Sequence, residues 1–196
     1  MSAPAITREI ADAGVGVGRL IRYDPRWPDG FNPTAGGFLR SFLGPLLGLP
    51  FYLIVVSAMT AANGAVVDNR VMWAAVASHV LNAVAFPAVI AAIAKPLRIG
   101  PGYAGFIIIV NWASLFLNIG TAAAAVLMLA GDTGQGLFTF FWLGLFGVSL
   151  FVTWRASRET LSEEIPIALL MVVLSVAVGV LADQVAGFAF AVSAAG

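Results

Sequence analysis

The sequence contains no cysteine, a single histidine and few charged residues. Without cysteine the chain forms no disulfide and offers no thiol nucleophile or thiolate metal ligand. Charged side chains make up 10% of the 196 residues, whereas soluble domains carry about 25%. Hydrophobic residues make up 60%. This composition excludes an ordinary soluble domain and a disordered chain, and it indicates a multi-span membrane protein.

The scarcity of polar side chains also argues against several chemistries. Ten basic and ten acidic residues cancel, so no basic field attracts a nucleic-acid partner. A metal site needs several histidine, cysteine or carboxylate ligands, and we expect neither a metal nor another cofactor. A serine hydrolase would have to use His79 as its base, and no spacing selects a nucleophile among Ser57, Ser114, Ser149 and Ser175. No Walker A sequence is present. We therefore predict that the chain is not an enzyme.

Long uncharged windows predict the fold. They lie at residues 41–67, 71–94, 99–131, 133–154 and 165–182. A membrane helix needs about 20 mainly apolar residues, so each window is long enough for one span and none for two. The windows also lack the polar–apolar alternation of a membrane β-strand. We predict an all-α, polytopic membrane helical bundle over residues 41–196, with five transmembrane helices near 41–62, 72–94, 104–129, 136–154 and 166–186.

Residues 1–40 form a more polar N-terminal arm. They carry five arginines and four acidic residues, and they lack the compact apolar core of a signal peptide. The charged residues lie away from a set of apolar residues that recur at helical spacing, namely Ile6, Ile10, Val17, Leu20 and Ile21. This pattern predicts an interfacial amphipathic helix. Glycines at positions 14, 16 and 18 weaken that helix.

The basic residues predict the orientation of the chain. Nine of the ten fall in the arm or in the connections after the second and fourth spans. The remaining one, Arg70, falls on the opposite side. By the positive-inside rule, the N-terminus is cytoplasmic and the C-terminus is outside. The predominance of arginine over lysine, with much alanine, glycine and valine, favours a bacterial inner membrane with a periplasmic C-terminus.

Two stripes of polar residues lie within the predicted second and third spans. The six side chains are Ser78, His79, Asn82, Asn111, Ser114 and Asn118. Within each stripe, residues three, four or seven apart share one helix face. Polar side chains in hydrocarbon face the protein interior, so we expect both stripes to point into the bundle. They either line a substrate or ion path, or form hydrogen bonds that fix helix packing.

The first span carries a candidate packing face. Gly44 and Gly48 form a GxxxG pattern, which lets two helices approach closely. The approaching helix belongs either to a partner or to the same bundle. Pro50 in the first span and Pro87 in the second each remove a backbone donor and predict a bend.

Asp183 is the one acidic residue with apolar sequence on both sides. If the fifth helix ends near Asp183, the carboxylate lies at the membrane interface. If the helix extends toward Phe190, Asp183 becomes an intramembrane carboxylate and a possible proton site. The charge pattern leaves both placements open.

The segments FLRSFLGPLLGLPFYL and IIIVNWASL, the latter with the pair Asn111-Trp112, follow the aromatic-rich arm. In this layout the chain resembles small bacterial five-span membrane proteins that are distantly similar to the Yip1 family. The resemblance implies five spans with a cytoplasmic N-terminus and a membrane-organising role without catalytic residues.

Two functions follow from these features. The first is a non-catalytic integral membrane protein that acts through helix packing as an accessory subunit, scaffold or membrane organiser. Its partners would be the lipid bilayer and another membrane protein, or further copies of itself in parallel orientation. The second is a small transporter or channel with a polar path between the second and third spans. The charge bias excludes an antiparallel pair.

Reporter fusions test the predicted orientation. A fusion after Gly64 and a fusion at Gly196 should both place the reporter outside the cytoplasm, because the nine basic residues keep the opposite end of the bundle on the cytoplasmic side. A periplasmic phosphatase should be active at both positions, and a cytoplasmic fluorescent reporter should be dark. Cytoplasmic activity at either position would contradict this topology.

Overall fold

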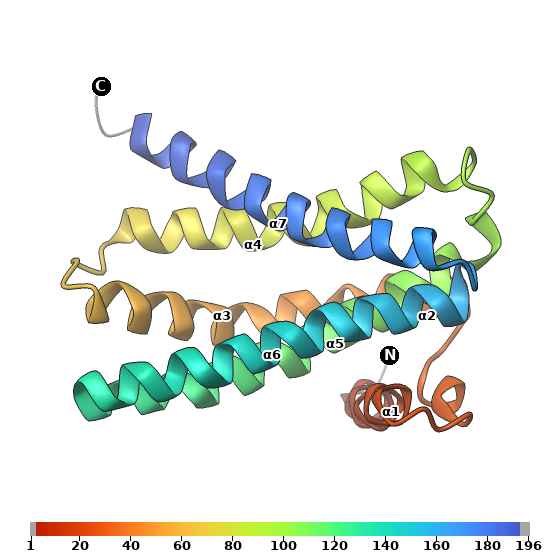
Figure 1. Ribbon diagram of the computed structural model, residues 1–196, viewed down its shortest axis with the longest axis horizontal. Coiled ribbons are helices and arrows are strands. Elements are labelled where there is room, and N and C mark those ends of the chain that lie inside the picture. Colours follow the sequence, from red (N-terminus) through yellow and green to blue (C-terminus); the bar gives the residue numbers. More distant parts are fainter. Residues whose placement is uncertain (1–2, 193–196) are drawn as a thin grey trace.

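The computed structural model describes residues 3–192, and in that part of the chain it contains helices and no strand (Figure 1). The α-helices are α1 (Ala3–Ile21), α2 (Ala35–Ser41), α3 (Leu43–Ala62), α4 (Asn69–Ala94), α5 (Tyr103–Ala125), α6 (Gly131–Thr160) and α7 (Ile165–Val192). Short 3-10 helices connect them: η1 (Trp27–Gly30), η2 (Gly100–Gly102) and η3 (Val126–Ala130). The predicted all-α bundle is confirmed. Gly196, the position of the C-terminal fusion, lies outside the described residues.

Five segments are long and apolar enough to cross a membrane. They are Ala35–Ala62, Asn69–Ala94, Gly100–Met128, Gly131–Thr160 and Ile165–Phe190. The predicted number of spans is confirmed, and most spans extend further than predicted. The first segment begins with α2, where the Thr34 side chain accepts a hydrogen bond from the Gly37 N–H at 3.1 Å and caps the helix. The predicted boundary at residue 41 therefore falls at the end of α2.

Two of the predicted spans were too short because an arginine was taken as the limit of each. Arg40 had marked the start of the first window and Arg155 the end of the fourth. In the structure, Arg40 Nε lies 2.6 Å from Glu9 Oε2, and Arg155 Nη2 lies 2.6 Å from Glu159 Oε1. An arginine near the end of a span interrupts neither the helix nor the span, because its side chain reaches a partner or the membrane interface. The helices therefore continue through both positions.

Helix α5 is the centre of the bundle. Half of its most apolar window is buried (50%), whereas the other spans bury 17–22% of theirs. Helices α3 and α6 lie along α5, and α4 and α7 cross each other on another side of the bundle (Figure 1). The outward faces are apolar, with Leu46, Val84 and Phe140 exposed by 60%, 59% and 72%. Such surfaces fit contact with lipid.

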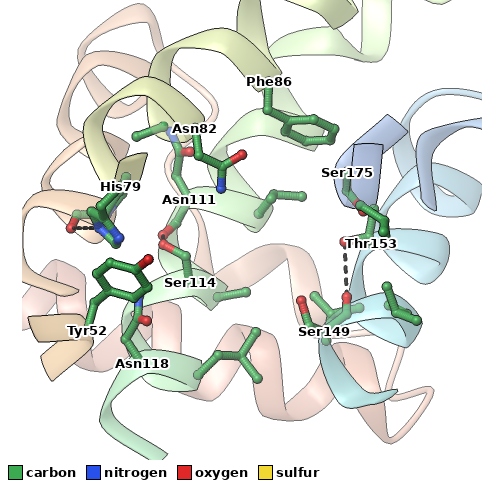
Figure 2. A pocket seen from close by; sticks show the side chains of 18 of the residues that line it. Tyr52, His79, Asn82, Phe86, Asn111, Ser114, Asn118, Ser149, Thr153 and Ser175 are labelled. Carbon is green, nitrogen blue, oxygen red and sulfur yellow. Dashed lines mark hydrogen bonds between the residues drawn. The ribbon is translucent and has the colours of Figure 1, made fainter. Parts of the chain in front are cut away.

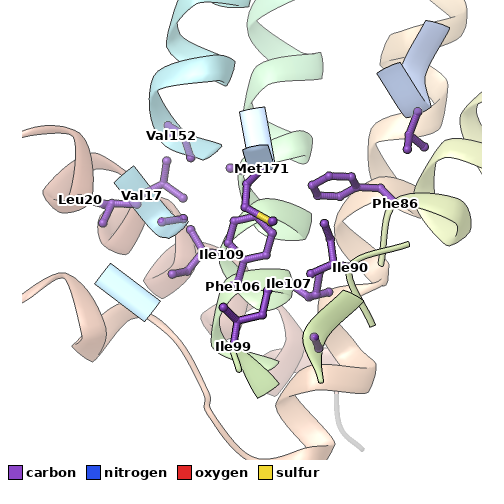
Figure 3. Close-up of a cluster of buried hydrophobic side chains, with 14 residues drawn as sticks. Val17, Leu20, Phe86, Ile90, Ile99, Phe106, Ile107, Ile109, Val152 and Met171 are labelled. Atoms are coloured by element: carbon purple, nitrogen blue, oxygen red, sulfur yellow. The ribbon is translucent and has the colours of Figure 1, made fainter. Parts of the chain in front are cut away.

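The connections sort to two ends of the bundle. Helix α1, the α4–α5 connection and the α6–α7 connection gather at one end (right in Figure 1), and the α3–α4 and α5–α6 connections lie at the other. A dense hydrophobic core fills the first end, with Leu20, Ile90, Ile99, Phe106 and Met171 almost completely buried (Figure 3). This end is therefore packed like a small globular core.

Helix α1 is the predicted amphipathic helix. Figure 1 shows it end-on while the spans run across the view, so α1 lies crosswise to the bundle. Its buried residues include Val17 and Leu20 from the predicted apolar face. The glycines have a role that spacing did not indicate: a Cβ on Gly14 would lie 3.0 Å from the Phe116 ring, and one on Gly16 would lie 3.1 Å from the Gly30 backbone. They let α1 approach its neighbours closely.

The arm is attached to the bundle by polar contacts. The Arg155 guanidinium lies 4.2 Å from the centre of the Tyr23 ring, a cation–π contact between the arm and α6. Near it, the side-chain hydrogen bond from Arg26 lowers the pKa of Asp24 to about 2. This carboxylate stays charged throughout the physiological pH range, so the turn after α1 keeps its ion pair.

Gly44 and Gly48 face α5 within the same chain. A Cβ on Gly44 would collide with the backbone carbonyl oxygen of Asn111, and one on Gly48 would lie 2.8 Å from Nδ2 of Asn118. Of the two roles left open by the sequence, the structure places this face in internal packing. It is not available to a partner helix.

Substituting Gly44 tests the α3–α5 contact. Gly44→Ala should lower the free energy of unfolding by about 1–3 kcal/mol, because the added methyl group forces two backbones apart. Gly147→Ala and Gly179→Ala are matched controls, since a Cβ at either position meets nothing within 4 Å. The controls should be neutral or stabilising by up to about 1 kcal/mol. Denaturation of the purified protein in detergent measures all three, and equal stability of Gly44→Ala and the controls would contradict the contact.

Candidate functional site

A cavity of about 300 Å³ lies between helices α3 to α7, and all five candidate spans line it (Figure 2). Its floor includes Asn111 and Thr153, which are 6% and 4% exposed. Phe146 on α6 and Val176 on α7 line it and are 41% and 38% exposed. Asn82 on α4 is also exposed, so the cavity is closed around Asn111 and Thr153 and open where α4, α6 and α7 carry exposed lining residues.

The cavity lining combines polar and apolar side chains. The polar ones are Tyr52, His79, Asn82, Asn111, Ser114, Asn118, Ser149, Thr153 and Ser175. No lysine, arginine, aspartate or glutamate lines it. The cavity is therefore neutral and offers both hydrogen-bond donors and acceptors.

The two predicted polar stripes meet in this cavity. Helix α4 contributes His79 and Asn82, and α5 contributes Asn111, Ser114 and Asn118. Helical periodicity explains why each set shares one face. Ser78 belongs to the predicted set and does not line the cavity. It is the neighbour of His79 along α4, so its side chain points about 100° away around the helix.

His79 is held in a defined orientation. Its Nε2 lies 2.8 Å from the backbone carbonyl oxygen of Pro45 in α3. Since a carbonyl oxygen only accepts, Nε2 carries the proton and Nδ1 of the neutral ring is left as an acceptor. The Tyr52 ring packs against the imidazole with centroids 4.9 Å apart. His79 thus joins α4 to α3 at one wall of the cavity.

Asn111 and Ser114 take part in the packing of the bundle. Asn111 Nδ2 donates to Ser41 Oγ at 3.0 Å, and Ser41 Oγ donates to the Phe38 carbonyl oxygen at 2.7 Å. Ser114 Oγ donates to the Asn111 carbonyl oxygen at 2.7 Å. The Asn111–Ser41 bond connects α5 to α2, and the Ser114 bond lies within α5. Asn111 therefore fulfils the packing role that the sequence left open for the polar stripe.

Three other side chains are free for a bound molecule. Within the described part of the chain, Asn82, Asn118 and Ser149 make no side-chain hydrogen bond. Figure 2 shows Asn82 pointing into the cavity, with Ser149 and Thr153 on the other side. Each amide offers two donors and one acceptor. They favour a ligand that both donates and accepts hydrogen bonds.

Sequence reasoning missed Tyr52 and the wall formed by α6. The signal for Tyr52 was present, since it follows Gly44 and Gly48 at intervals of four and so lies on the same helix face. Thr153 lies four residues after Ser149 and donates to its carbonyl oxygen at 3.0 Å. From the sequence, Ser149 and Ser175 were candidates for a hydrolase nucleophile and not for a binding site.

No serine is paired with His79 among the described residues. Ser57 Oγ donates to the Leu53 carbonyl oxygen at 2.8 Å, and Ser175 Oγ donates to that of Val172 at 2.8 Å. His79 itself binds a backbone carbonyl, so the Ser–His contact of a hydrolase is absent from residues 3–192. The same residues contain no group of three metal-ligating side chains.

Ser78 instead contacts Asp183. Its Oγ donates to Oδ1 of Asp183 on α7, and Ser78 is 5% exposed. Helix α7 continues past Asp183 to Val192, and the candidate span extends to Phe190. The alternative in which the fifth helix ends near Asp183 is therefore wrong.

Comparisons with protein-family models, curated proteins and solved structures gave no match to this chain. The similarity to the Yip1 family stays a prediction.

A matched pair of substitutions separates packing residues from free ones. Asn111→Leu should lower the free energy of unfolding by about 1–2 kcal/mol, because it removes a buried hydrogen bond to Ser41. Asn82→Leu should change it by less than about 0.5 kcal/mol, since Asn82 has no partner to lose. Denaturation in detergent measures both. A larger loss for Asn82→Leu than for Asn111→Leu would contradict the assigned roles.

Proposed function

We propose that this chain is a small, non-catalytic membrane transporter that binds a neutral solute in its central cavity. The observation that carries the proposal is the convergence of both polar stripes on one cavity lined by all five candidate spans. If hydrogen bonding served packing alone, the polar side chains would bond each other. Asn82 and Asn118 instead face the cavity without a partner in the described chain.

The cavity favours a particular class of solute. Its volume of about 300 Å³ is at the lower end for small-molecule pockets, which hold about 300–1,000 Å³. The lining offers amides and hydroxyls and no charged group, so an ionic solute would lose its hydration without gaining a counter-charge. The exposed lining residues of α6 and α7, Phe146 and Val176, lie on the outer surface of the bundle, which lipid contacts in a membrane. A small neutral or amphipathic molecule with hydroxyl or amide groups suits this lining.

The proposed location is the bacterial inner membrane, with the N-terminus in the cytoplasm. Support comes from the end of the bundle where α1 and the α4–α5 and α6–α7 connections gather (Figure 1). Nine basic residues belong to these segments and the adjoining helix ends, and Arg70 lies at the other end. This asymmetry favours a parallel oligomer, or a complex with another membrane protein, over an antiparallel pair.

An accessory subunit or membrane organiser is a second candidate. One observation favours it: α6 buries the smallest share of its apolar window, 17%, and exposes an aromatic face. Phe140 and Phe141 are 72% and 48% exposed, and Trp142 stacks on Phe146 with centroids 5.8 Å apart. Membrane helices associate by packing of such surfaces. In this alternative α6 contacts the partner, because Gly44 and Gly48 are occupied by α5.

Cysteine accessibility tests the transport proposal without knowledge of the solute. The natural chain has no cysteine, so a single introduced thiol is the only target. Asn82→Cys and Ser149→Cys should react with a charged, membrane-impermeant methanethiosulfonate in sealed vesicles, because a transporter must open its cavity to water in one state of its cycle, even though the opening in this structure faces the lipid side. Val84→Cys, on the exposed face of the same helix as Asn82, is the matched lipid-facing control and should not react.

Asn63→Cys, in the α3–α4 connection, reports that the reagent reaches the protein. Reaction of Asn63→Cys with no reaction at either cavity position, from either side of the membrane, would contradict a transport cavity. Co-purification of a stoichiometric membrane protein that is lost on Phe140→Ala, but retained on Asn82→Leu, would support the accessory-subunit alternative instead.

A further inference from the structure

We propose that Asp183 is a proton-binding carboxyl group within the membrane, and that its protonation state is transmitted to the cavity through Ser78 and helix α7. The link to the cavity rests on the proposed function; the proton site itself stands on the geometry around Asp183. No charged group lines the cavity, so a proton that drives transport would have to bind beside it.

Asp183 lies within the candidate membrane span of α7, away from its ends. Ser78 is the tenth residue of α4, which begins at Asn69 beside Asp68 and Arg70. At a rise of 1.5 Å per residue, Ser78 lies about 13 Å along the helix from that polar end. Asp183 is hydrogen-bonded to Ser78 and so lies at the same level. Asp183 is exposed on the outer surface of the bundle, and beyond Gln184 the residues that follow it along α7, including Phe188 and Phe190, are apolar.

The Asp183 carboxylate has no counter-charge among the described residues. Among the described residues Asp183 forms no salt bridge; its partner is the Ser78 hydroxyl. The neighbouring titratable groups are His79, which follows Ser78 on α4, and Tyr52 on α3, whose ring packs on His79. Helices α3 and α7 carry no cationic residue, and α6 carries none before Arg155. An unpaired carboxylate is costly in hydrocarbon, and taking up a proton removes that cost.

Ser78, the partner of Asp183, adjoins the wall of the cavity, because the next residue on α4 is His79. Tyr52 lines the cavity and packs on the ring of His79, which follows Ser78 along α4. Ser78 donates to Asp183 when the carboxyl group is charged, and accepts from it when the group is protonated. Proton uptake thus reverses one hydrogen bond between α4 and α7.

Helix α7 belongs both to the Asp183 site and to the wall of the cavity. It carries Asp183, and it contributes Ser175 and Val176 to the cavity lining. A weaker bond between α7 and α4 at Asp183 loosens the helix that forms one side of the cavity opening. Protonation and cavity access are therefore coupled through one helix, as a proton-driven transporter requires.

A hydrophobic carbodiimide tests the proton site, because dicyclohexylcarbodiimide modifies protonated carboxyl groups in apolar surroundings. The whole chain is placed in lipid nanodiscs, treated from pH 5 to 9, and digested for mass spectrometry. Asp68 and Asp132 near the ends of spans are reference carboxyls in the same sample. At pH 7, Asp183 should be modified about tenfold faster than either or more, since apolar surroundings and the lack of a counter-charge favour the neutral carboxyl group that the reagent attacks.

Two variants and one ion sharpen this test. Ser78→Ala removes a donor to the charged form, so modification of Asp183 should persist to higher pH than in the natural chain. Asp183→Asn should abolish modification of that peptide. Sodium ions at 100-fold excess over protein should not protect Asp183. Modification no faster than at Asp68 and Asp132, or protection by sodium, would overturn the proton site.

The coupling is tested separately. The rate at which methanethiosulfonate modifies Asn82→Cys is measured against pH with Asp183 and with Asp183→Asn in the same background. The intrinsic pH dependence of the thiol is common to both, so a difference between the curves reports Asp183. Superimposable curves would overturn the coupling and leave the proton site standing. Absence of any reaction at Asn82→Cys would count against the transport function, while carbodiimide modification would still decide the proton site.

Discussion

The close contact between α3 and α5 is the constraint on which the site depends. Gly44 lies against the Asn111 carbonyl, and Gly48 lies beside the Asn118 amide. Both asparagines also line the cavity. Because the glycines bring the two helices together, α2 comes within hydrogen-bonding distance of Asn111, and Tyr52 is placed one turn beyond Gly48 in the cavity wall. Helix packing and the candidate site therefore use the same residues of α5.

A chain with so few polar groups joins its helices by a few specific bonds. Two of these use proline residues: His79 binds the Pro45 carbonyl oxygen, and the Tyr103 hydroxyl donates to the Pro87 carbonyl oxygen at 3.0 Å. Ser78 and Asp183 join α4 to α7 in the same way. In an apolar medium each such bond selects one arrangement of two helices, since an unpaired polar group has no water to bond. The free amide of Asn82 is an exception to this pattern, and it faces the cavity.

The sequence predicted what depends on a single helix and missed what depends on its neighbours. The spans followed from uncharged windows, and the inward direction of Asn111, Ser114 and Asn118 followed from their spacing. Arg155 pairs with Glu159 one turn along the same helix, a spacing that the sequence does show, whereas Arg40 pairs with Glu9 of α1, and that pairing is a tertiary property. For the same reason the contact of Ser78 with Asp183, residues 105 positions apart, was invisible to any local pattern. For the cavity, the sequence indicated only that the polar stripes of the second and third spans face the interior of the bundle.

The separation of the carboxyl group from the cavity has a physical advantage. A charged aspartate inside a cavity of about 300 Å³ would attract cations and bind water tightly, and it would exclude a neutral solute. Placed behind Ser78, Asp183 changes the strength of the α4–α7 contact, because a carboxylate accepts a stronger hydrogen bond than a neutral carboxyl group. The cavity keeps its neutral lining in both protonation states. The energy of proton binding then acts on the position of α7, whose Ser175 and Val176 stand at the cavity, and leaves the chemistry of solute recognition unchanged.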